Sequence, residues 1–201
     1  MRTFPSLRGF ALGTALLVSA CSHMPLASMA RLSSFDPMRA DLAALRAAVR
    51  MPSGIAPVPG GAGLALAYWR EGEEDGRRME AITLEEVKAP EDAASLVAEK
   101  GMAVAVFRIP PADLPRLEAI RAEIETARAE DQAGGRRPRG SLSVSMKGCV
   151  RGPVPDGPLP VTTYLKIAQG GDFIPLLRDV DLRSLKSPDG RMTAEPLQPC
   201  S

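Results

Sequence analysis

Asp179 and Asp181 are the residues whose type and spacing come nearest to a catalytic pair. Side chains two positions apart in an extended strand share a face, so their carboxylates would lie within reach of a common ligand or cation. Carboxylate pairs of this kind hydrolyse glycosidic bonds in many enzymes. The alternative is that both face solvent on the final strand. The scarcity of aromatic rings for stacking on sugars, one Trp and two Tyr, favours this second interpretation.

Histidine-dependent catalysis has little support in this sequence. The single histidine, His23, lies close to the N-terminus. Ser-His-Asp and Cys-His sites need an imidazole base within the folded body, so these enzyme classes are not expected. We therefore expect no catalytic residue set and no cofactor, with an enzyme as the less favoured class.

The N-terminus carries the most specific motif. Two arginines are followed by an apolar run over residues 10–18, and the sequence LVSAC at 17–21 ends on Cys21. This order of basic, apolar and small residues resembles the lipobox of bacterial lipoproteins. The resemblance implies that a lipid is attached to the Cys21 thiol and that residues 1–20 are removed. The run is shorter than the about 20 residues of a spanning helix. An ordinary secretory signal cut elsewhere and a buried N-terminal helix are the alternatives.

The resemblance also implies a location. The three acyl chains of the family would make release from the membrane negligible. Ser22 replaces the Asp that retains enterobacterial members at the inner membrane, which implies the outer membrane, with the domain in the periplasm. Removal of residues 1–20 leaves 23 basic and 24 acidic residues, a net charge of −1. This balance gives no support for nucleic-acid binding.

With Cys21 used by the lipid, Cys149 and Cys200 remain in a compartment that oxidises thiols. We expect them to form a disulfide that pins the C-terminus to an interior strand. The chain-entropy model gives roughly 4 kcal/mol of stabilisation for a loop of this length. A free thiol pair and a metal site are the alternatives, and zinc is disfavoured because the body has no histidine.

Arg136, Arg137 and Arg139 form a basic loop within the glycine-bounded segment 134–140. Beside a lipid-anchored domain they could meet anionic head groups, at up to about 1 kcal/mol for each arginine. The alternative is a flexible, solvated loop, since short charge runs are usually solvated.

The elements that must position these residues follow from periodicity and turn signals. We expect helices over 34–50, 90–100 and 114–127. The first rests on the helical spacing of Met38, Leu42, Leu45 and Val49. The third has a solvated face that carries Glu118, Arg121, Glu125 and Arg128. Strands are expected over 64–69, 78–87, 102–109, 141–150, 161–167 and 174–182, with a turn-rich connection over 57–63 and antiparallel pairing of the first two strands.

These elements predict three segments: a removed signal peptide over 1–20, a lipidated tether over 21–34 and a single domain over 35–201. The domain is expected to be α+β, with a mainly antiparallel sheet of five or six strands and about three helices packed on one face. An α/β layering or two small sheets are the alternatives.

The function class that fits best is a membrane-anchored binding or structural module without catalysis, with another envelope protein as a candidate partner. A periplasmic carboxylate-dependent hydrolase or small-ligand-binding protein is the alternative. An enzyme would offer a pocket with convergent titratable groups, and a binding module an exposed apolar patch or open strand edge.

Overall fold

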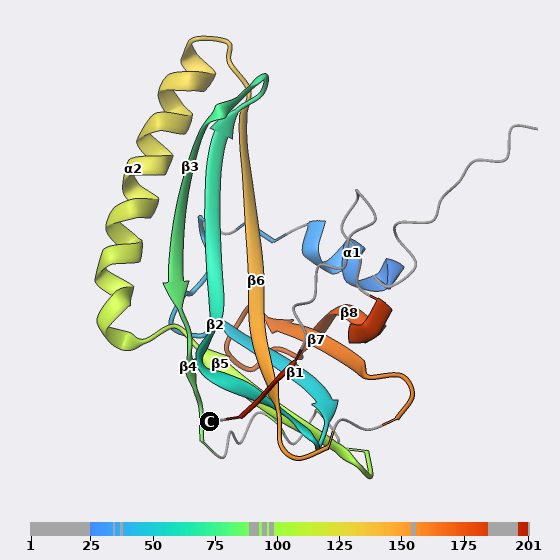
Figure 1. Ribbon diagram of the computed structural model, residues 1–201. Coiled ribbons are helices and arrows are strands. Elements are labelled where there is room, and N and C mark those ends of the chain that lie inside the picture. Colours follow the sequence, from blue (N-terminus) through green and yellow to red (C-terminus); the bar gives the residue numbers. More distant parts are fainter. Residues whose placement is uncertain are drawn as a thin grey trace, which may run out of the picture.

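The computed structural model describes residues 25–33, 35–36, 38–88, 93, 96, 99–153, 156–184 and 197–200. Within these residues the chain forms two β-sheets, of five and four strands, and two α-helices (Figure 1). Part of the four-stranded sheet rises out of the body as a long arm, and the longer helix lies beside it (Figure 1).

The five-stranded sheet has the order β4-β5-β1-β7-β8. Its strands are β1 (Arg46–Pro52), β4 (Glu85–Glu86), β5 (Met102–Arg108), β7 (Pro160–Lys166) and β8 (Ile174–Asp181). All neighbouring pairs are antiparallel. β1 is the central strand, and its residues Ala47, Ala48 and Val49 are buried in succession. Both faces of the strand are therefore covered, which is typical of a short continuous apolar run inside a sheet.

The four-stranded sheet has the order β3-β2-β6-β9. Its strands are β2 (Ile55–Arg70), β3 (Glu73–Thr83), β6 (Pro138–Val150) and β9 (Gln198–Pro199). β2 and β3 form a hairpin that turns at Glu71 and Gly72, and Gly72 has a φ of 82°, which favours glycine. We call residues 62–70, 73–83 and 138–146 of β2, β3 and β6 the arm.

β2 contains a bulge between Pro57 and Ala62, where its register with β6 shifts. Gly60 has a φ of 70°, and a Cβ on Gly61 would lie 2.9 Å from the carbonyl oxygen of Val58. The turn-rich connection expected over 57–63 is therefore wrong. The glycines bend one continuous strand and do not end it.

The two α-helices differ in length and place. α2 (Leu114–Ala133) runs along the arm, and α1 (Leu26–Ser33) lies against β8 (Figure 1). Arg31 of α1 forms an ion pair with Asp172 at 3.6 Å, and Ser28 is buried. Most of the segment expected as a tether is therefore a helix packed on the body. No helix in the described ranges is long and apolar enough to cross a membrane.

The core lies where the two sheets and α2 meet. Leu45 and Val49 from the β1 region pack with Phe107 of β5, Leu64 of β2 and Leu117 of α2 in one cluster of buried residues. Burial of each such side chain contributes roughly 1.5–3 kcal/mol relative to exposure. The arm is therefore attached to the body through the main core.

Several expected elements are confirmed. α2 contains the helix expected over 114–127. β5, β6, β7 and β8 correspond to the strands expected over 102–109, 141–150, 161–167 and 174–182. The antiparallel hairpin of 64–69 with the next strand is also confirmed, as β2 with β3. The helix expected over 90–100 lies mostly outside the described residues.

The predicted fold class is wrong. The expectation was α+β with one sheet of five or six strands and about three helices on one face, but the described residues form nine strands in two sheets and two α-helices. The helix expected over 34–50 is the main error, because its last five residues, 46–50, belong to β1. Asp36 and Asp41 accept hydrogen bonds at 2.9 Å from the N–H groups of Met38 and Ala43. Such bonds stabilise single turns as well as the starts of helices, and here neither turn continues into a helix.

Candidate functional site

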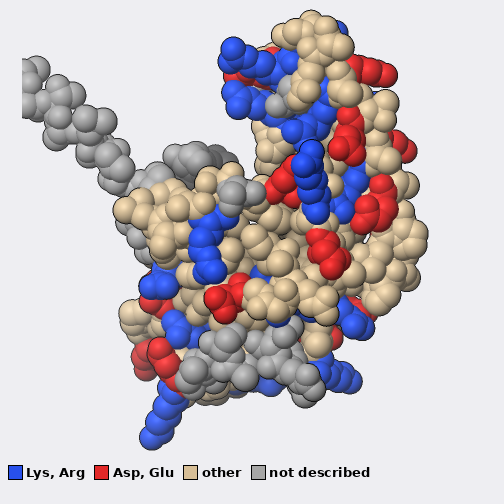
Figure 2. Space-filling model, turned by 180° about the vertical axis from the view of Figure 1, so that it is seen from behind, with Lys and Arg blue, Asp and Glu red and all other residues tan. Residues whose placement is uncertain are grey.

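An open groove of about 790 Å³ lies between the arm and the body. Figure 2 shows the molecule hollowed at this place, with uncharged residues on the floor and both basic and acidic residues on the arm above it. α1 and the segment after it, β2, α2, β6, β7 and β8 all contribute to its lining. The floor includes Leu66, Leu142, Val144, Leu165, Leu176 and Leu177.

The strand pairing explains why the arm side of the groove is apolar. Leu66 of β2 pairs with Leu142 of β6, and Leu64 pairs with Val144. Alternate residues of a strand share a face, so these leucines and the valine form one apolar surface. Leu142 and Val144 are only partly buried, although they pack against the core. Neighbouring residues therefore cover only part of the apolar surface of the arm.

Among the described lining residues, three are charged: Arg128 of α2, Arg139 of β6 and Asp36 after α1. Arg139 donates to Glu71 at 2.5 Å, and Asp36 lies 3.7 Å from Arg39 in an ion pair. Arg128 is half-buried and has no ion pair within 4.0 Å among the residues that the structure describes. The arm end of the groove is therefore cationic.

Asp131, near the end of α2, is fully buried beside this cationic end. Its carboxylate accepts hydrogen bonds from the Tyr68 hydroxyl at 2.5 Å, from Arg70 Nε at 2.8 Å and from Arg136 Nε at 2.9 Å. The hydrogen bond from Tyr68 is the main reason that the pKa of Asp131 falls from 3.8 to about 2; both arginines lower it further and burial opposes them. Burial, with the bond to this carboxylate, raises the pKa of Tyr68. The ionised carboxylate thus fastens the last turns of α2 to β2.

The face of α2 expected to be solvated is partly buried. Arg121 is only 7% exposed, and its guanidinium donates to the carbonyl oxygen of Ala40 at 2.6 Å and to Glu118 at 3.0 Å. The prediction for Arg121 is wrong because the segment before β1 covers the helix and offers an acceptor there. Apolar periodicity alone cannot detect a charged residue that is buried with its partners.

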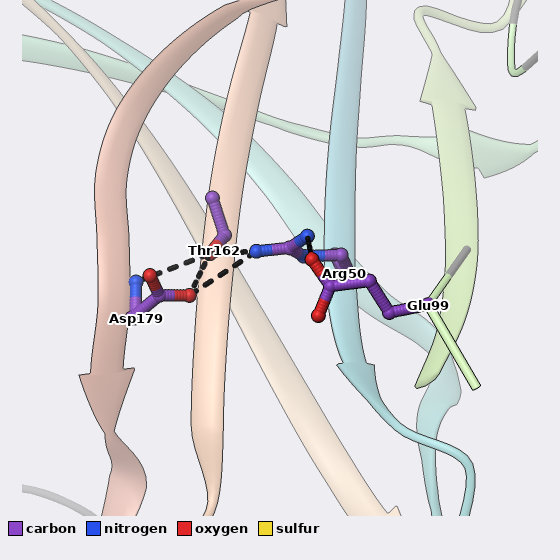
Figure 3. A network of polar contacts seen from close by, with 4 residues as sticks. All are labelled: Arg50, Glu99, Thr162 and Asp179. Atoms are coloured by element: carbon purple, nitrogen blue, oxygen red, sulfur yellow. Dashed lines mark hydrogen bonds and ion pairs between the residues drawn. The ribbon is translucent and has the colours of Figure 1, made fainter. Parts of the chain in front are cut away.

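A second polar cluster lies in the five-stranded sheet (Figure 3). Arg50 of β1 donates to Glu99 at 2.9 Å and to Asp179 of β8 at 3.2 Å. The hydroxyl of Thr162 on β7 donates to the Asp179 carboxylate at 3.0 Å and accepts from the Asp179 N–H at 3.1 Å. Asp179 has a φ of 50°, a left-handed conformation that Asp adopts more readily than most residues. The cluster joins three strands of the sheet.

The two aspartates singled out in the sequence have separate partners. Asp181 accepts hydrogen bonds from the N–H groups of Leu159 at 2.9 Å and Arg183 at 3.1 Å, and these donors lower its pKa. Asp179 instead binds Arg50 and Thr162. Neither residue lines the groove, and no cluster of three or more metal-binding side chains occurs in the described part of the chain. Both aspartates therefore take part in separate hydrogen-bond networks at β8.

The three loop arginines lie at the tip of the arm. Arg136 binds Asp131, whereas Arg137 and Arg139 face Glu71 at 4.0 and 2.5 Å. All three remain exposed, but nearby carboxylates offset part of their charge. Their contact with an anionic surface stays a prediction.

The predicted disulfide is confirmed between Cys149 and Cys200, 51 residues apart. It lies where β9 pairs with the end of β6 in parallel register, and so fastens the C-terminal segment to the sheet. Cys21, Ser22 and His23 lie outside the described residues.

No protein-family model, curated protein sequence or solved structure matches this chain. The interpretation of the groove therefore rests on its geometry. Sequence reasoning missed this site because its lining comes from segments far apart in the chain. The apolar lining residues, taken one at a time, have the pattern of ordinary core positions.

Proposed function

We propose that this chain is a lipid-anchored protein of the bacterial envelope that acts as a binding module without catalysis, and that the groove is its binding site. The observation that carries the proposal is the groove itself, with a volume of about 790 Å³ and a mostly apolar lining. Pockets for small molecules span about 300–1,000 Å³ and are mostly apolar with a few polar groups. Uncovered apolar surface of this kind commonly marks a binding site.

The position of α1 supports a place at the membrane. Leu26 of α1 is 79% exposed, and Met29, one turn further, is also exposed. Cys21 can lie no further than about 14 Å from Pro25, because each residue spans at most ~3.6 Å. A lipid on Cys21 would hold the exposed apolar side of α1 close to the bilayer surface. The other end of α1, at Leu32 and Ser33, lines the groove.

The disulfide supports an extracytoplasmic location. The Cys149–Cys200 bond fits a compartment that oxidises thiols. Ser22 favours the outer membrane by resemblance to enterobacterial lipoproteins, with the domain facing the periplasm. A carboxylate-dependent hydrolase is the weaker alternative, because Asp179 and Asp181 bind different partners.

The anchor is tested by the intact mass of the protein purified from bacterial membranes. The expected mass is that of residues 21–201 plus acyl groups, and a Cys21→Ser variant should lack the acyl mass. An unacylated wild-type chain cut at another position would contradict the anchor.

The groove is tested with N-phenyl-1-naphthylamine, a neutral probe that fluoresces in apolar sites. Val144→Trp places a large ring on the groove floor, whereas Ser143→Trp places the same ring at the neighbouring exposed position, which does not line the groove. We expect the wild type and Ser143→Trp to bind the probe, and Val144→Trp to bind it at least tenfold more weakly. Equal binding by all three proteins would refute the groove as the site. Melting curves show whether each variant is folded, since overpacking typically costs about 1–3 kcal/mol.

A further inference from the structure

We propose that the groove binds a single-chain anionic lipid from the membrane, with the alkyl chain on the leucine floor and the anionic head group at Arg128. This inference rests on the proposed function and adds the chemical class of the ligand. The carrying observation is the change in polarity along the groove, from the cationic arm end to the apolar end at Leu176 and Leu177.

Arg128 differs from the other arginines near this end of the arm. Arg70 and Arg136 bind Asp131, and Arg139 binds Glu71. Arg128 is half-buried and faces the groove without an ion pair among the described residues. Partial burial of a charge is unfavourable unless an opposite charge or hydrogen-bond acceptors compensate. A phosphate or carboxylate would supply both, because guanidinium binds these groups with paired hydrogen bonds.

The charges around the groove favour an anion over a cation. Asp36 is the single acidic residue in the described lining, and Arg39 forms an ion pair with it. Two carboxylates lie beside the cationic end, and both already have partners. Asp131 is fully buried and accepts three hydrogen bonds, and Glu71 accepts a hydrogen bond from Arg139 at 2.5 Å. No acidic group in the described lining is therefore positioned to hold a positively charged head group beside Arg128.

The dimensions of the groove favour one alkyl chain. From Arg139 to Val144, β6 advances five residues, or about 17 Å at ~3.4 Å per residue. The cationic end of the groove and its apolar floor thus follow one another along β6. A ligand with one charged end and one alkyl chain has the same order of polarity. The volume of about 790 Å³ lies in the small-molecule range. A surface for a folded protein partner would be broader than this.

The experiment uses calorimetric titration of the chain from Ser22 to Ser201, which contains every element of the structure. The ligands are dodecyl phosphate, laurate and the neutral analogue dodecanol, each as a monomer in solution. Arg128→Gln removes the proposed head-group contact. Arg116→Gln is the matched control, because Arg116 lies on the same helix, outside the groove, in an exposed ion pair with Glu80.

We expect the wild type to bind dodecyl phosphate or laurate more tightly than dodecanol. Arg128→Gln should weaken binding of the anionic ligand about tenfold and leave dodecanol binding unchanged, since a hydrogen bond to a charged group contributes that much or more. Arg116→Gln should bind all three ligands as the wild type does. The relative affinities for dodecyl phosphate and laurate identify the preferred head group.

The outcomes separate this inference from the proposed function. If Arg128→Gln weakens anionic and neutral ligands equally, or weakens neither, the head-group assignment is overturned while the groove remains a binding site. If Val144→Trp binds every ligand as the wild type does, both proposals fail. If no lipid binds and sedimentation shows a dimer that Val144→Trp dissociates, a second copy of the chain covers the groove and the lipid inference is overturned.

Discussion

Removal of the Cys149–Cys200 disulfide should lower the stability of the domain by a predictable amount. The bond closes a loop of 51 residues. In the chain-entropy model, such a loop reduces the entropy of the unfolded chain by about 14 cal/mol/K, or about 4 kcal/mol at room temperature. Each kcal/mol shifts the melting temperature of a domain of this size by about 2–4 °C. We therefore expect a decrease of about 8–16 °C.

The loss should also be visible locally at the end of β6. β9 is only two residues long and pairs with Cys149 and Val150, and the N–H of Cys200 donates to the Val150 carbonyl at 2.9 Å. A strand of two residues is too short to stay paired by its own hydrogen bonds, so the disulfide keeps β9 paired with β6. Amide exchange at Cys200 should therefore become fast when the bond is reduced.

The assay compares thermal melting of two chains that both carry Cys21→Ser. One retains the disulfide, and the other carries Cys149→Ser and Cys200→Ser. Adding reductant to the first should reproduce the melting temperature of the second. A difference below about 2 °C, with slow amide exchange at residue 200 in both chains, would refute the entropic reasoning.

Three further predictions concern charged side chains. Asp131→Asn should lower the melting temperature at pH 7 and make the melting temperature less dependent on pH in acid. The pKa of Asp131 is depressed to about 2, so its carboxylate stabilises the fold fully above about pH 4 and progressively less as the pH falls through 2. Melting curves of both proteins between pH 2 and 7 test this, and parallel curves would contradict it. Arg50→Ala should cost about 1–3 kcal/mol in urea denaturation, because Arg50 is only 16% exposed and its loss removes the hydrogen bonds to both Glu99 and Asp179. Glu99→Gln, at the exposed end of the same cluster, should cost less than about 1 kcal/mol. Replacement of Arg136, Arg137 and Arg139 by Ser should reduce flotation of the chain from Ser22 onward with anionic vesicles. Equal flotation of the two proteins would contradict a contact between these arginines and an anionic membrane surface.

Much of the secondary structure could be predicted from local patterns. α2 has a long helical repeat between Pro111 and Gly134, and apolar and polar residues alternate along β7 and β8 on either side of a glycine turn. These local patterns predict all three elements. The disulfide is predicted by the cysteine count together with the resemblance of residues 17–21 to a lipobox. The helix and the strands depend on neighbouring residues, and the disulfide depends on the number of cysteines left to pair, so the sequence alone indicates both.

The rest depends on contacts between distant segments. The run from Ala47 to Val49 is apolar because two other strands flank β1, and a helix with the same composition is equally consistent with the local pattern. Arg121 is buried because a backbone carbonyl from Ala40 meets it, 81 positions away in the chain. The groove is formed where α1, the arm and β8 meet, so no local signal marks it.

The most direct test of the central claim is native mass spectrometry of the full-length protein purified from bacterial membranes. We predict residues 21–201 with covalent acyl groups and, in addition, a non-covalent small amphipath that is absent from Val144→Trp and present in Ser143→Trp. A wild-type protein that carries nothing beyond its covalent acyl groups, or the same bound mass in all three proteins, would contradict the groove as a binding site.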